Sequence, residues 1–424
     1  MPQKSFQLFG SDVKDPLLLE VMGKLRSQIK PFSPKKVEGV LSQELGGDIF
    51  DFFQDFNMQP IAAATIGQVH MGTLLTGQAV VVKIKRPGIE HRVSDELTLL
   101  RSLTQDSAII SFIDEIEKIM KKELDFLLEK ENLRKAKEIY ENSANEKLKV
   151  IAPINLLEKS NDVIVMEKAR GKQIYAAEAQ LPALIKAEAL LYLLEKWFEE
   201  ALFGSGFFHA DLHGGNIFLE PAPSLSRIPL IDSDFSVNDY HEDQIQDYKL
   251  WLIDFGSVGF LSDSDAGSLL KLIVGLSFKS NSLVLEALQH IMSINQANIG
   301  ELKKFIENLW EKGAGELQYL DELFNKVISM NLPLPENMIL FYRGKALIEK
   351  QIKVLADNIE QDLAATNLEA PKFELNPIYH KVMQRNILRE LLPLTNWTGK
   401  NKRKILDKSS RKFFVNYYLD LIAD

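Results

Sequence analysis

The stretch GFFHADLHGGNIFLE, residues 206–220, places four hydrogen-bonding side chains between two apolar runs. His209, Asp211, His213 and Asn216 fall within eight positions, and two glycines stand between the last two of them. A catalytic zinc site needs three protein ligands, and neither a cysteine nor an H-E-x-x-H motif in the chain supports one. We therefore expect one of the two histidines to pack into the loop and to hydrogen-bond its backbone.

The spacing of Asp211 and Asn216 is the informative feature of this stretch. They are five residues apart, as in the D-x-x-x-x-N catalytic loop of protein kinases. In that loop the aspartate orients the nucleophile or accepts its proton, and the asparagine amide oxygen ligates Mg²⁺. The two glycines permit the chain to fold back between these side chains. The spacing predicts a catalytic role for Asp211 and a metal-binding role for Asn216.

A further aspartate follows an apolar run in LWLIDFGSVG, residues 250–259. Asp254 precedes Phe-Gly, and an aspartate that ends a buried strand before a glycine turn is well placed to hold Mg²⁺ on phosphate oxygens. A near-copy of this motif at Asp234 lies in a polar segment that lacks such a strand and the glycine, so we reject it. We predict Asp254 as the second metal ligand.

A lysine in a predicted β-hairpin supplies a matching cation. The segments IGQVHMG and QAVVVKIK flank a turn at residues 76–77, and Lys83 follows three valines in the second strand. A lysine at such a place is ordinarily a solvated strand end, but it also suits nucleotide phosphates when a helix carboxylate orients it. Candidates for that carboxylate lie in KKELDFLLEKEN: Glu123, Asp125, Glu129 and Glu131.

Composition limits the class of protein. The chain has 424 residues, 46% of them hydrophobic and 26% charged, which indicates a globular protein with more than one compact part. The net charge of −9 argues against a nucleic-acid partner. The N-terminal residues lack the apolar core of a signal peptide, and no uncharged apolar run reaches the roughly 18 residues of a membrane span. We expect a cytoplasmic protein.

The order of predicted elements indicates the fold. Helices come first, followed by a small β-rich part with Lys83, a pair of short strands, and a large helical part. This is the order of an α+β, bilobal protein-kinase-like fold with a small β-rich N-lobe, a large helical C-lobe and an N-terminal helical extension. We expect the extension over residues 1–58, the N-lobe over 59–168, and the C-lobe over 169–424 with an acidic insertion at 220–249.

These motifs together resemble the UbiB/AarF-domain atypical kinases over nearly the whole chain. QPIAAATIGQVH resembles the alanine-rich loop that replaces the glycine-rich phosphate loop, KELDFLLEKEN the E-x-D helix, and VIVMEKARGKQI the hinge that meets adenine. The resemblance implies ATP (or ADP) and Mg²⁺ as cofactors, slow ATPase activity, and support of ubiquinone or other isoprenoid-lipid metabolism. The additional site residues that it implies are Ala62, Ala63 and Ala64 in the loop, Lys83 on phosphate, Glu129 as partner of Lys83, and Met166, Glu167 and Lys168 in the hinge.

Both ends of the chain carry features of their own. KSFQ, residues 4–7, has Phe6 where the family's K-x-G-Q motif has glycine, which argues against close backbone packing there. The C-terminal stretch KNKRKILDKSSRKFFVNYYLDLIAD is basic and aromatic, so it suits either peripheral contact with anionic lipid or a terminal helix docked on the large lobe. We favour the docked helix.

Three functions fit the motifs. The first is a UbiB-type ATP-dependent kinase or ATPase, whose partners are a nucleotide and an isoprenoid lipid or quinone precursor. The second is a small-molecule phosphotransferase of the aminoglycoside or choline type, because HADLHGGN resembles that group's loop as well. The alanine-rich loop and the E-x-D helix argue against it. The third is a scaffold that binds nucleotide without turnover, which the full set of catalytic residues disfavours.

Overall fold

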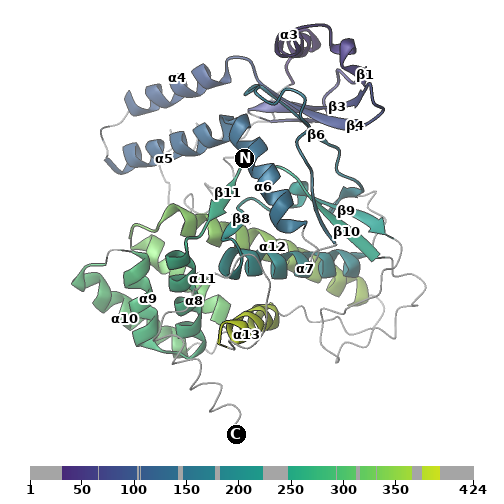
Figure 1. Ribbon diagram of the computed structural model, residues 1–424. Helices are drawn as coiled ribbons and strands as arrows, with labels where there is room; N and C mark the ends of the chain where they lie inside the picture. The colour runs from purple at the N-terminus through teal and green to yellow at the C-terminus, as the bar shows by residue number, and fades with distance from the viewer. Residues whose placement is uncertain are drawn as a thin grey trace. The chain divides into compact units, whose positions relative to one another are not determined.

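The computed structural model describes residues 31–391 except 65, 103–104, 106, 142–146, 177–181, 223–246, 293, 312–315, 331 and 365–374. The chain divides into two compact units, and the colour bar of Figure 1 lets the reader follow its path through them. Unit 1 comprises Met1–Ala179, Gly214–Ala222 and Tyr248–Ser257. Unit 2 comprises Gln180–His213, Pro223–Asp247 and Val258–Asp424. Unit 1 therefore combines three separate segments of the chain, and each of them carries predicted site residues.

Unit 1 contains the two larger sheets of the described part of the chain. Its helices are α3 (Pro34–Leu45), η1 (Ile49–Asp51), α4 (Ile89–Ser102), α5 (Ser107–Leu124), α6 (Phe126–Tyr140) and η2 (Gly214–Asn216). Its strands are β1 (Phe53–Phe56), β2 (Ala62–Ala63), β3 (Gly67–Leu74), β4 (Ala79–Lys85), β5 (Leu148–Val150), β6 (Val163–Glu167), β7 (Lys172–Gln173), β9 (Ile217–Ala222) and β10 (Asp247–Leu252).

An antiparallel sheet with the strand order β1-β3-β4-β6, and with β2 paired to β3, carries Lys83. Side chains alternate between the two faces of a strand. Val80, Val82 and Ile84 of β4 point to one face, where they are fully buried in a core shared with α3. Lys83, which lies between two of these residues, therefore projects from the opposite face.

Local signals explain why the hairpin and the helix before it form where they do. The turn between β3 and β4 contains Gly77 with φ 82°, a left-handed conformation that glycine adopts without steric cost. Helix α3 begins with Pro34 after the N-cap Ser33, and it ends at Gly46, whose φ is 70°. The predicted turn at residues 76–77 is confirmed.

The second sheet of unit 1 joins its three chain segments in the order β5-β10-β9-β7. Strand β10 runs parallel to β5 from the first segment, with Leu250 opposite Leu148. Strand β9 pairs antiparallel with β7. Near that pairing, a Cβ on Gly171 would stand 1.9 Å from the carbonyl oxygen of Leu219, so only glycine fits there. This sheet brings the residues before Asp254 into the same unit as Lys83.

Unit 2 is mainly helical. Its described elements are α7 (Ala183–Phe203), β8 (Phe207–His209), β11 (Val258–Phe260), α8 (Asp263–Ser277), α9 (Asn281–Ile291), α10 (Gln296–Glu311), α11 (Glu316–Ser329), α12 (Glu336–Ala364) and α13 (Asn376–Leu391). Helix α7 is buried along most of its length and packs against α12, α13 and α8 (Figure 1). The short strands β8 and β11 pair antiparallel.

An aromatic cluster fixes α12 against α7 and β8. The ring of Trp197 stacks on that of Phe341 with centroids 4.9 Å apart, and Phe208 meets both rings edge-on at 5.6 and 5.7 Å. Phe198 and Tyr379 extend the cluster to α13 through an edge contact at 4.7 Å. Aromatic pairs in such geometries contribute about 0.5–1.5 kcal/mol each beyond their area burial. The cluster sets the register of α12 on the segment that precedes Asp211.

The predicted α+β class, the hairpin and the largely helical second half are confirmed, whereas the lobe boundaries remain predictions. Among the described residues, none of the helices is both long and apolar enough to cross a membrane. The KSFQ segment, most of the acidic insertion and the C-terminal basic stretch lie outside the described residues.

Candidate active site

Three charged side chains from separate motifs meet in unit 1. Lys83 Nζ donates hydrogen bonds to both carboxylate oxygens of Glu129, at 2.8 Å to Oε1 and 2.7 Å to Oε2. The same Nζ lies 3.7 Å from Oδ1 of Asp254. The side chain of Glu129 is 3% exposed, that of Lys83 20%, and that of Asp254 32%. The cluster is therefore a buried lysine–glutamate pair with an aspartate on its more open side.

Helix α6 presents Glu129 to the lysine. Asp125 caps the helix by accepting a hydrogen bond from the backbone N–H of Leu128, so Glu129 falls in the first turn, where the helix dipole favours an anion. The ring of Phe126, one residue after the cap, lies 5.1 Å from Lys83 Nζ in a cation–π contact. The start of α6 therefore supplies both the counter-ion and an apolar surface for the ammonium.

The four carboxylates that the sequence left open have different roles in the structure. Glu129 binds Lys83, and Asp125 caps the helix. Glu131 is exposed. Glu123 acts electrostatically, because its negative charge helps to raise the pKa of Lys83. The pairing of Lys83 with Glu129, which the family resemblance implied, is present in the structure.

Asp254 has an unusual backbone conformation. Its φ is 60°, in the left-handed region that residues other than glycine rarely adopt. Its Oδ1 accepts a hydrogen bond from the backbone N–H of Gly256 at 3.4 Å. The carbonyl oxygen of Phe255 accepts another from the side-chain amide of Asn132 on α6 at 3.0 Å. Strained residues of this kind concentrate at functional sites, and here α6 holds the strained turn beside Lys83.

Opposing effects set the charge of the lysine–glutamate pair. Burial alone would lower the pKa of Lys83, but the charges of Asp254 and Glu129 outweigh it, and the pKa is raised. Burial raises the pKa of Glu129, and Lys83 only partly offsets this. The short contacts to both carboxylate oxygens fit a charged ammonium. Lys83 therefore carries a permanent positive charge at neutral pH.

The predicted alanine-rich loop forms a short exposed strand. Ala62 and Ala63 make up β2, which pairs with β3, and the backbone N–H of Ala64 donates to the carbonyl of Gly67 at 2.8 Å. Each alanine carries a Cβ, which restricts backbone φ more than glycine does. The loop thus lies on the same sheet as Lys83.

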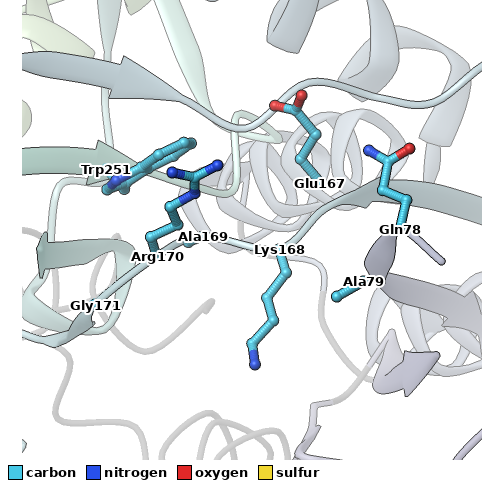
Figure 2. A pocket seen from close by; sticks show the side chains of 8 residues that line it. All are labelled: Gln78, Ala79, Glu167, Lys168, Ala169, Arg170, Gly171 and Trp251. Atoms are coloured by element: carbon cyan, nitrogen blue, oxygen red, sulfur yellow. The ribbon is translucent and has the colours of Figure 1, made fainter. Parts of the chain in front are cut away.

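The predicted hinge covers the end of strand β6 and the residue after it. Met166 is buried and pairs with Val81 on β4, so its side chain lies on the same face as Lys83. Glu167 accepts hydrogen bonds from Lys137 and from the backbone N–H of Ala152. Lys168, the next residue, is exposed, and Figure 2 shows its side chain pointing away from that of Glu167.

A pocket of about 490 Å³ lies beside the hinge (Figure 2). Its lining comprises Gln78, Ala79, Glu167, Lys168, Ala169, Arg170, Gly171 and Trp251. The indole N–H of Trp251 donates to Glu220 at 2.8 Å, and the Arg170 guanidinium lies over its ring at 5.9 Å. Neither Lys83 nor Asp254 belongs to the lining, so this pocket is separate from the charged cluster.

Asn216 lies in unit 1, next to the segment that contains Asp254. It ends the short helix η2 and is buried, and its carbonyl oxygen accepts a hydrogen bond from the backbone N–H of Ile253 at 3.1 Å. Ile253 directly precedes Asp254. One backbone hydrogen bond thus ties the two predicted metal ligands to the same part of unit 1.

Asp211 belongs to unit 2, where contacts with three other residues hold its loop. His209 Nδ1 accepts a hydrogen bond from the backbone N–H of Asp211 at 3.0 Å, which is the loop-packing role that the sequence favoured for a histidine here. Trp197 donates its indole N–H to the carbonyl of His209 at 2.8 Å. Arg343 Nη2 lies 2.9 Å from Asp211 Oδ1, and both side chains are less than a tenth exposed.

Two residues that contact the candidate site, Asn132 and Arg343, were not predicted from the sequence. Asn132 lies three residues after Glu129, so helical spacing could have placed both on one face of α6. Arg343 belongs to no motif, and the one available signal was a cation within the apolar pattern LFYRGKAL. Its partner is 132 positions away in the sequence.

A lysine bonded to a helix glutamate, beside the aspartate of an Asp-Phe-Gly turn, is an arrangement typical of kinase-like folds. The model of the ABC1 atypical kinase-like domain matches residues 24–288, more than half of the chain. The chain belongs to this family, and its fold is the α+β kinase-like fold that the sequence predicted.

Curated relatives carry kinase names. The chain is 30% identical over 262 residues to "Probable protein kinase UbiB" of Marinobacter nauticus, covering 58% of this chain and 43% of that protein. It is 27% identical over 367 residues to the protein of the same name from Haemophilus ducreyi, covering 80% and 62%. It is 28% identical over 284 residues to "Protein ACTIVITY OF BC1 COMPLEX KINASE 8, chloroplastic" of Arabidopsis thaliana, covering 64% and 34%. The chain thus spans less than two thirds of the length of each.

Proposed function

We propose that this protein binds ATP or ADP with Mg²⁺ and catalyses phosphoryl chemistry of the UbiB type. The observation that carries the proposal is the position of Lys83 Nζ, bonded to both oxygens of Glu129 and 3.7 Å from Asp254. A buried, permanently charged ammonium held in place by a carboxylate is suited to nucleotide phosphates. Catalysis of phosphoryl transfer depends mainly on such placement and electrostatic stabilisation.

The donor set of this chain fits Mg²⁺. Asp254 offers a carboxylate that is 32% exposed, and Asn216 offers an amide oxygen on the segment bonded to Ile253. Oxygen ligands from one or two carboxylates or amides, completed by phosphates and water, are the usual protein contribution to Mg²⁺ sites. Bound Mg²⁺ would neutralise charge on the phosphate oxygens. Asp211 is the proposed group that orients the acceptor or accepts its proton.

The first test is Mg²⁺-dependent turnover of ATP by the full chain. Lys83→Ala and Asp254→Asn should each lower kcat/KM for ATP by about 100-fold or more, since each removes a charge from the phosphate site. Normal turnover in Asp254→Asn, in a preparation free of other ATPases, would refute the metal assignment.

Lys85→Met is a matched control for Lys83. Lys85 lies on the same strand, and its Nζ stands 5.2 Å from the same Phe126 ring. Its side chain is 3% exposed, so it is more deeply buried than Lys83, and it pairs with Glu90 and Asp162 instead. We expect Lys85→Met to lower stability and to leave Mg²⁺-dependent turnover near the wild-type value. Equal losses in the Lys83 and Lys85 variants would show that the assay reports folding.

The acceptor that we propose is an isoprenoid lipid or quinone precursor, and the proposed location is cytoplasmic with peripheral membrane contact. The UbiB names of the relatives support the choice of acceptor. ATP turnover with and without liposomes and quinone-precursor analogues tests this acceptor, and we expect both additions to stimulate turnover.

Two other outcomes would favour the alternative functions. Phosphate incorporation into a small soluble acceptor would favour the small-molecule phosphotransferase, and nucleotide binding without turnover would favour the scaffold. Liposome flotation of the full chain and of a truncation at residue 398 tests whether the C-terminal stretch contacts the membrane. Equal flotation of the two proteins would rule out that contact.

A further inference from the structure

An ion pair in unit 2 fixes one oxygen of the proposed catalytic aspartate. Arg343 Nη2 donates to Asp211 Oδ1 at 2.9 Å. The Asp211 side chain is 3% exposed and the Arg343 side chain 8%. The other carboxylate oxygen, Oδ2, lies 3.9 Å from Nε2 of His213. A buried charge pair tolerates little displacement, because moving either charge away from its partner leaves both without compensation.

Helix α12 holds the neighbouring backbone of the same loop. Gln351 Nε2 donates to the carbonyl of Leu212, the residue after Asp211. Gln351 lies two helical turns after Arg343, so both side chains leave the same face of α12. Side chains of α12 therefore hydrogen-bond both the Asp211 carboxylate and the backbone carbonyl of Leu212.

The backbone of α12 also approaches the loop closely. A Cβ on Gly344 would stand 3.1 Å from the carbonyl oxygen of His209 and 2.7 Å from the Trp197 ring. Phe341, three residues earlier, is locked in the aromatic cluster with Trp197. The register of the helix is thus set independently of Arg343, and it delivers the guanidinium to Asp211.

We infer that Arg343 is a positioning residue for the proposed phosphoryl transfer, in which its ion pair orients the Asp211 carboxylate while α12 holds the catalytic loop. The inference rests on the proposed function. An arginine suits the role because its guanidinium stays charged and its planar group fixes direction, whereas a lysine supplies only a point charge. Arg343 acts on the acceptor side of the reaction, and the nucleotide groups Lys83 and Asp254 belong to unit 1.

The test compares Arg343→Met and Arg343→Lys with the wild-type full chain in Mg²⁺-dependent ATP turnover, below the unfolding temperature of every variant. Arg343→Met should lower kcat by about 100-fold, the scale of loss when a reacting group is misplaced by about 1 Å. KM for ATP should change little. Arg343→Lys should recover part of the lost kcat, because lysine keeps the positive charge. The recovery should be incomplete, because lysine lacks the planar guanidinium that fixes the direction of the hydrogen bond.

Arg385→Met is the matched control. Arg385 on α13 forms a comparable pair in unit 2, with Nη1 3.0 Å from Glu195 Oε1 and Nη2 2.7 Å from Glu199 Oε2. The Arg385→Met variant should have a lower unfolding temperature than wild type but an unchanged kcat. An unchanged kcat in Arg343→Met, or an equal loss in Arg385→Met, would overturn the inference while leaving the proposed function intact.

The double variant Asp211→Asn/Arg343→Met guards against a folding artefact, because it removes both buried charges together. Its unfolding temperature should exceed that of Arg343→Met, since no carboxylate is left buried without its partner. A double variant that is less stable than Arg343→Met would overturn the ion pair itself. A wild-type chain without turnover, together with the expected gain in the double variant, would overturn the proposed function instead.

Discussion

The Lys83–Glu129 pair leads to a prediction about pH, because its two members respond differently to burial. Lys83→Met leaves a carboxylate that is 3% exposed without its ammonium. We expect this variant to lose about 3–5 kcal/mol of unfolding free energy near pH 8, the usual result of leaving one partner of a buried pair uncompensated. Burial already raises the pKa of Glu129 from its ordinary value of 4.5. A group with a raised pKa contributes most when protonated, so the deficit should shrink toward pH 5.

Chemical denaturation of wild type and Lys83→Met at pH 5 and pH 8 measures this difference. The control is the double variant Lys83→Met/Glu129→Gln, whose deficit should vary less with pH because the buried Glu129 carboxylate is no longer there to be protonated. A deficit in Lys83→Met that does not vary with pH would contradict a buried, charged Glu129.

His70 leads to a second prediction at this scale. It is fully buried, and its Nδ1 lies 2.9 Å from the carbonyl oxygen of Asn57, which can only accept a hydrogen bond. Nδ1 therefore carries the proton, and Nε2 accepts from the side-chain amide of Gln68 at 2.8 Å. Gln68 Oε1 in turn accepts from the backbone N–H of Phe32, just before α3. A proton on Nε2 would break this chain of hydrogen bonds.

Burial lowers the pKa of His70 below its ordinary value of 6.5, and the bond to Asn57 offsets this only in part. The folded state therefore resists protonation, so stability is present above pH 6.5 and is lost as the pH falls below it. The loss should reach at most about 1.4 kcal/mol per pH unit. His70→Gln should have a flatter profile of unfolding free energy between pH 7.5 and 5.5. Parallel profiles for the two proteins would show that His70 does not titrate in this range.

At the residue scale, the candidate site residues that could be predicted from the sequence are those that belong to short motifs. Lys83, Asn216 and Asp254 could be proposed because each follows a strand or turn signal that is local in sequence. The choice of Glu129 over its neighbours needed the family resemblance, since four carboxylates share one charged segment. Arg343 could not be predicted from the sequence, because its contact with Asp211 joins residues 132 positions apart.

At the scale of elements, two glycines in helices should respond to alanine in opposite ways. Gly300 in α10 has nothing within 4 Å of the place where a Cβ would stand. Gly300→Ala should therefore stabilise the chain by about 0.5–1 kcal/mol through helix propensity alone. The same propensity gain applies to Gly344, but the added methyl would stand 2.7 Å from Trp197 and 3.1 Å from the His209 carbonyl.

We expect Gly344→Ala to destabilise the chain by about 1–3 kcal/mol, because overpacking displaces α12 from the loop. It should also lower ATP turnover, which Gly300→Ala should leave unchanged. Thermal unfolding and steady-state turnover of the two variants, measured side by side, check both statements. Stabilisation by Gly344→Ala would mean that a methyl group fits between α12 and its neighbours Trp197 and His209, and would contradict the close packing of α12 at this contact.

The elements themselves were largely predictable where the signals are local. Pro34 and Gly46 delimit α3, and Gly77 marks the hairpin turn, because caps and left-handed turns depend on the residues in place. The sheet β5-β10-β9-β7 was not predictable, since parallel pairing of β10 with β5 joins segments about 100 residues apart. No residue pattern within either segment encodes that partner.

At the scale of the whole chain, the proposed nucleotide-binding residues and the proposed transfer residue belong to different units. Lys83, Asn216 and Asp254 belong to unit 1, and Asp211 belongs to unit 2. A ligand that binds only the folded state stabilises it by about 2.7 kcal/mol at 100 times its Kd. Mg²⁺-ATP should therefore raise the unfolding temperature of wild type, and it should do so much less in Asp254→Asn, which lacks a charge of the phosphate site.

Asp211→Asn should behave differently from Asp254→Asn. Its starting stability should fall, because the buried ion pair of Asp211 with Arg343 is lost. The rise in unfolding temperature on adding Mg²⁺-ATP should nevertheless match that of wild type, since the nucleotide groups of unit 1 are intact, while ATP turnover should fall by about 100-fold or more. Thermal unfolding with and without Mg²⁺-ATP, and turnover of the same preparations, distinguish the two aspartates. Loss of the ligand-induced shift in Asp211→Asn would place this residue in nucleotide binding and remove the basis for assigning it to the transfer step.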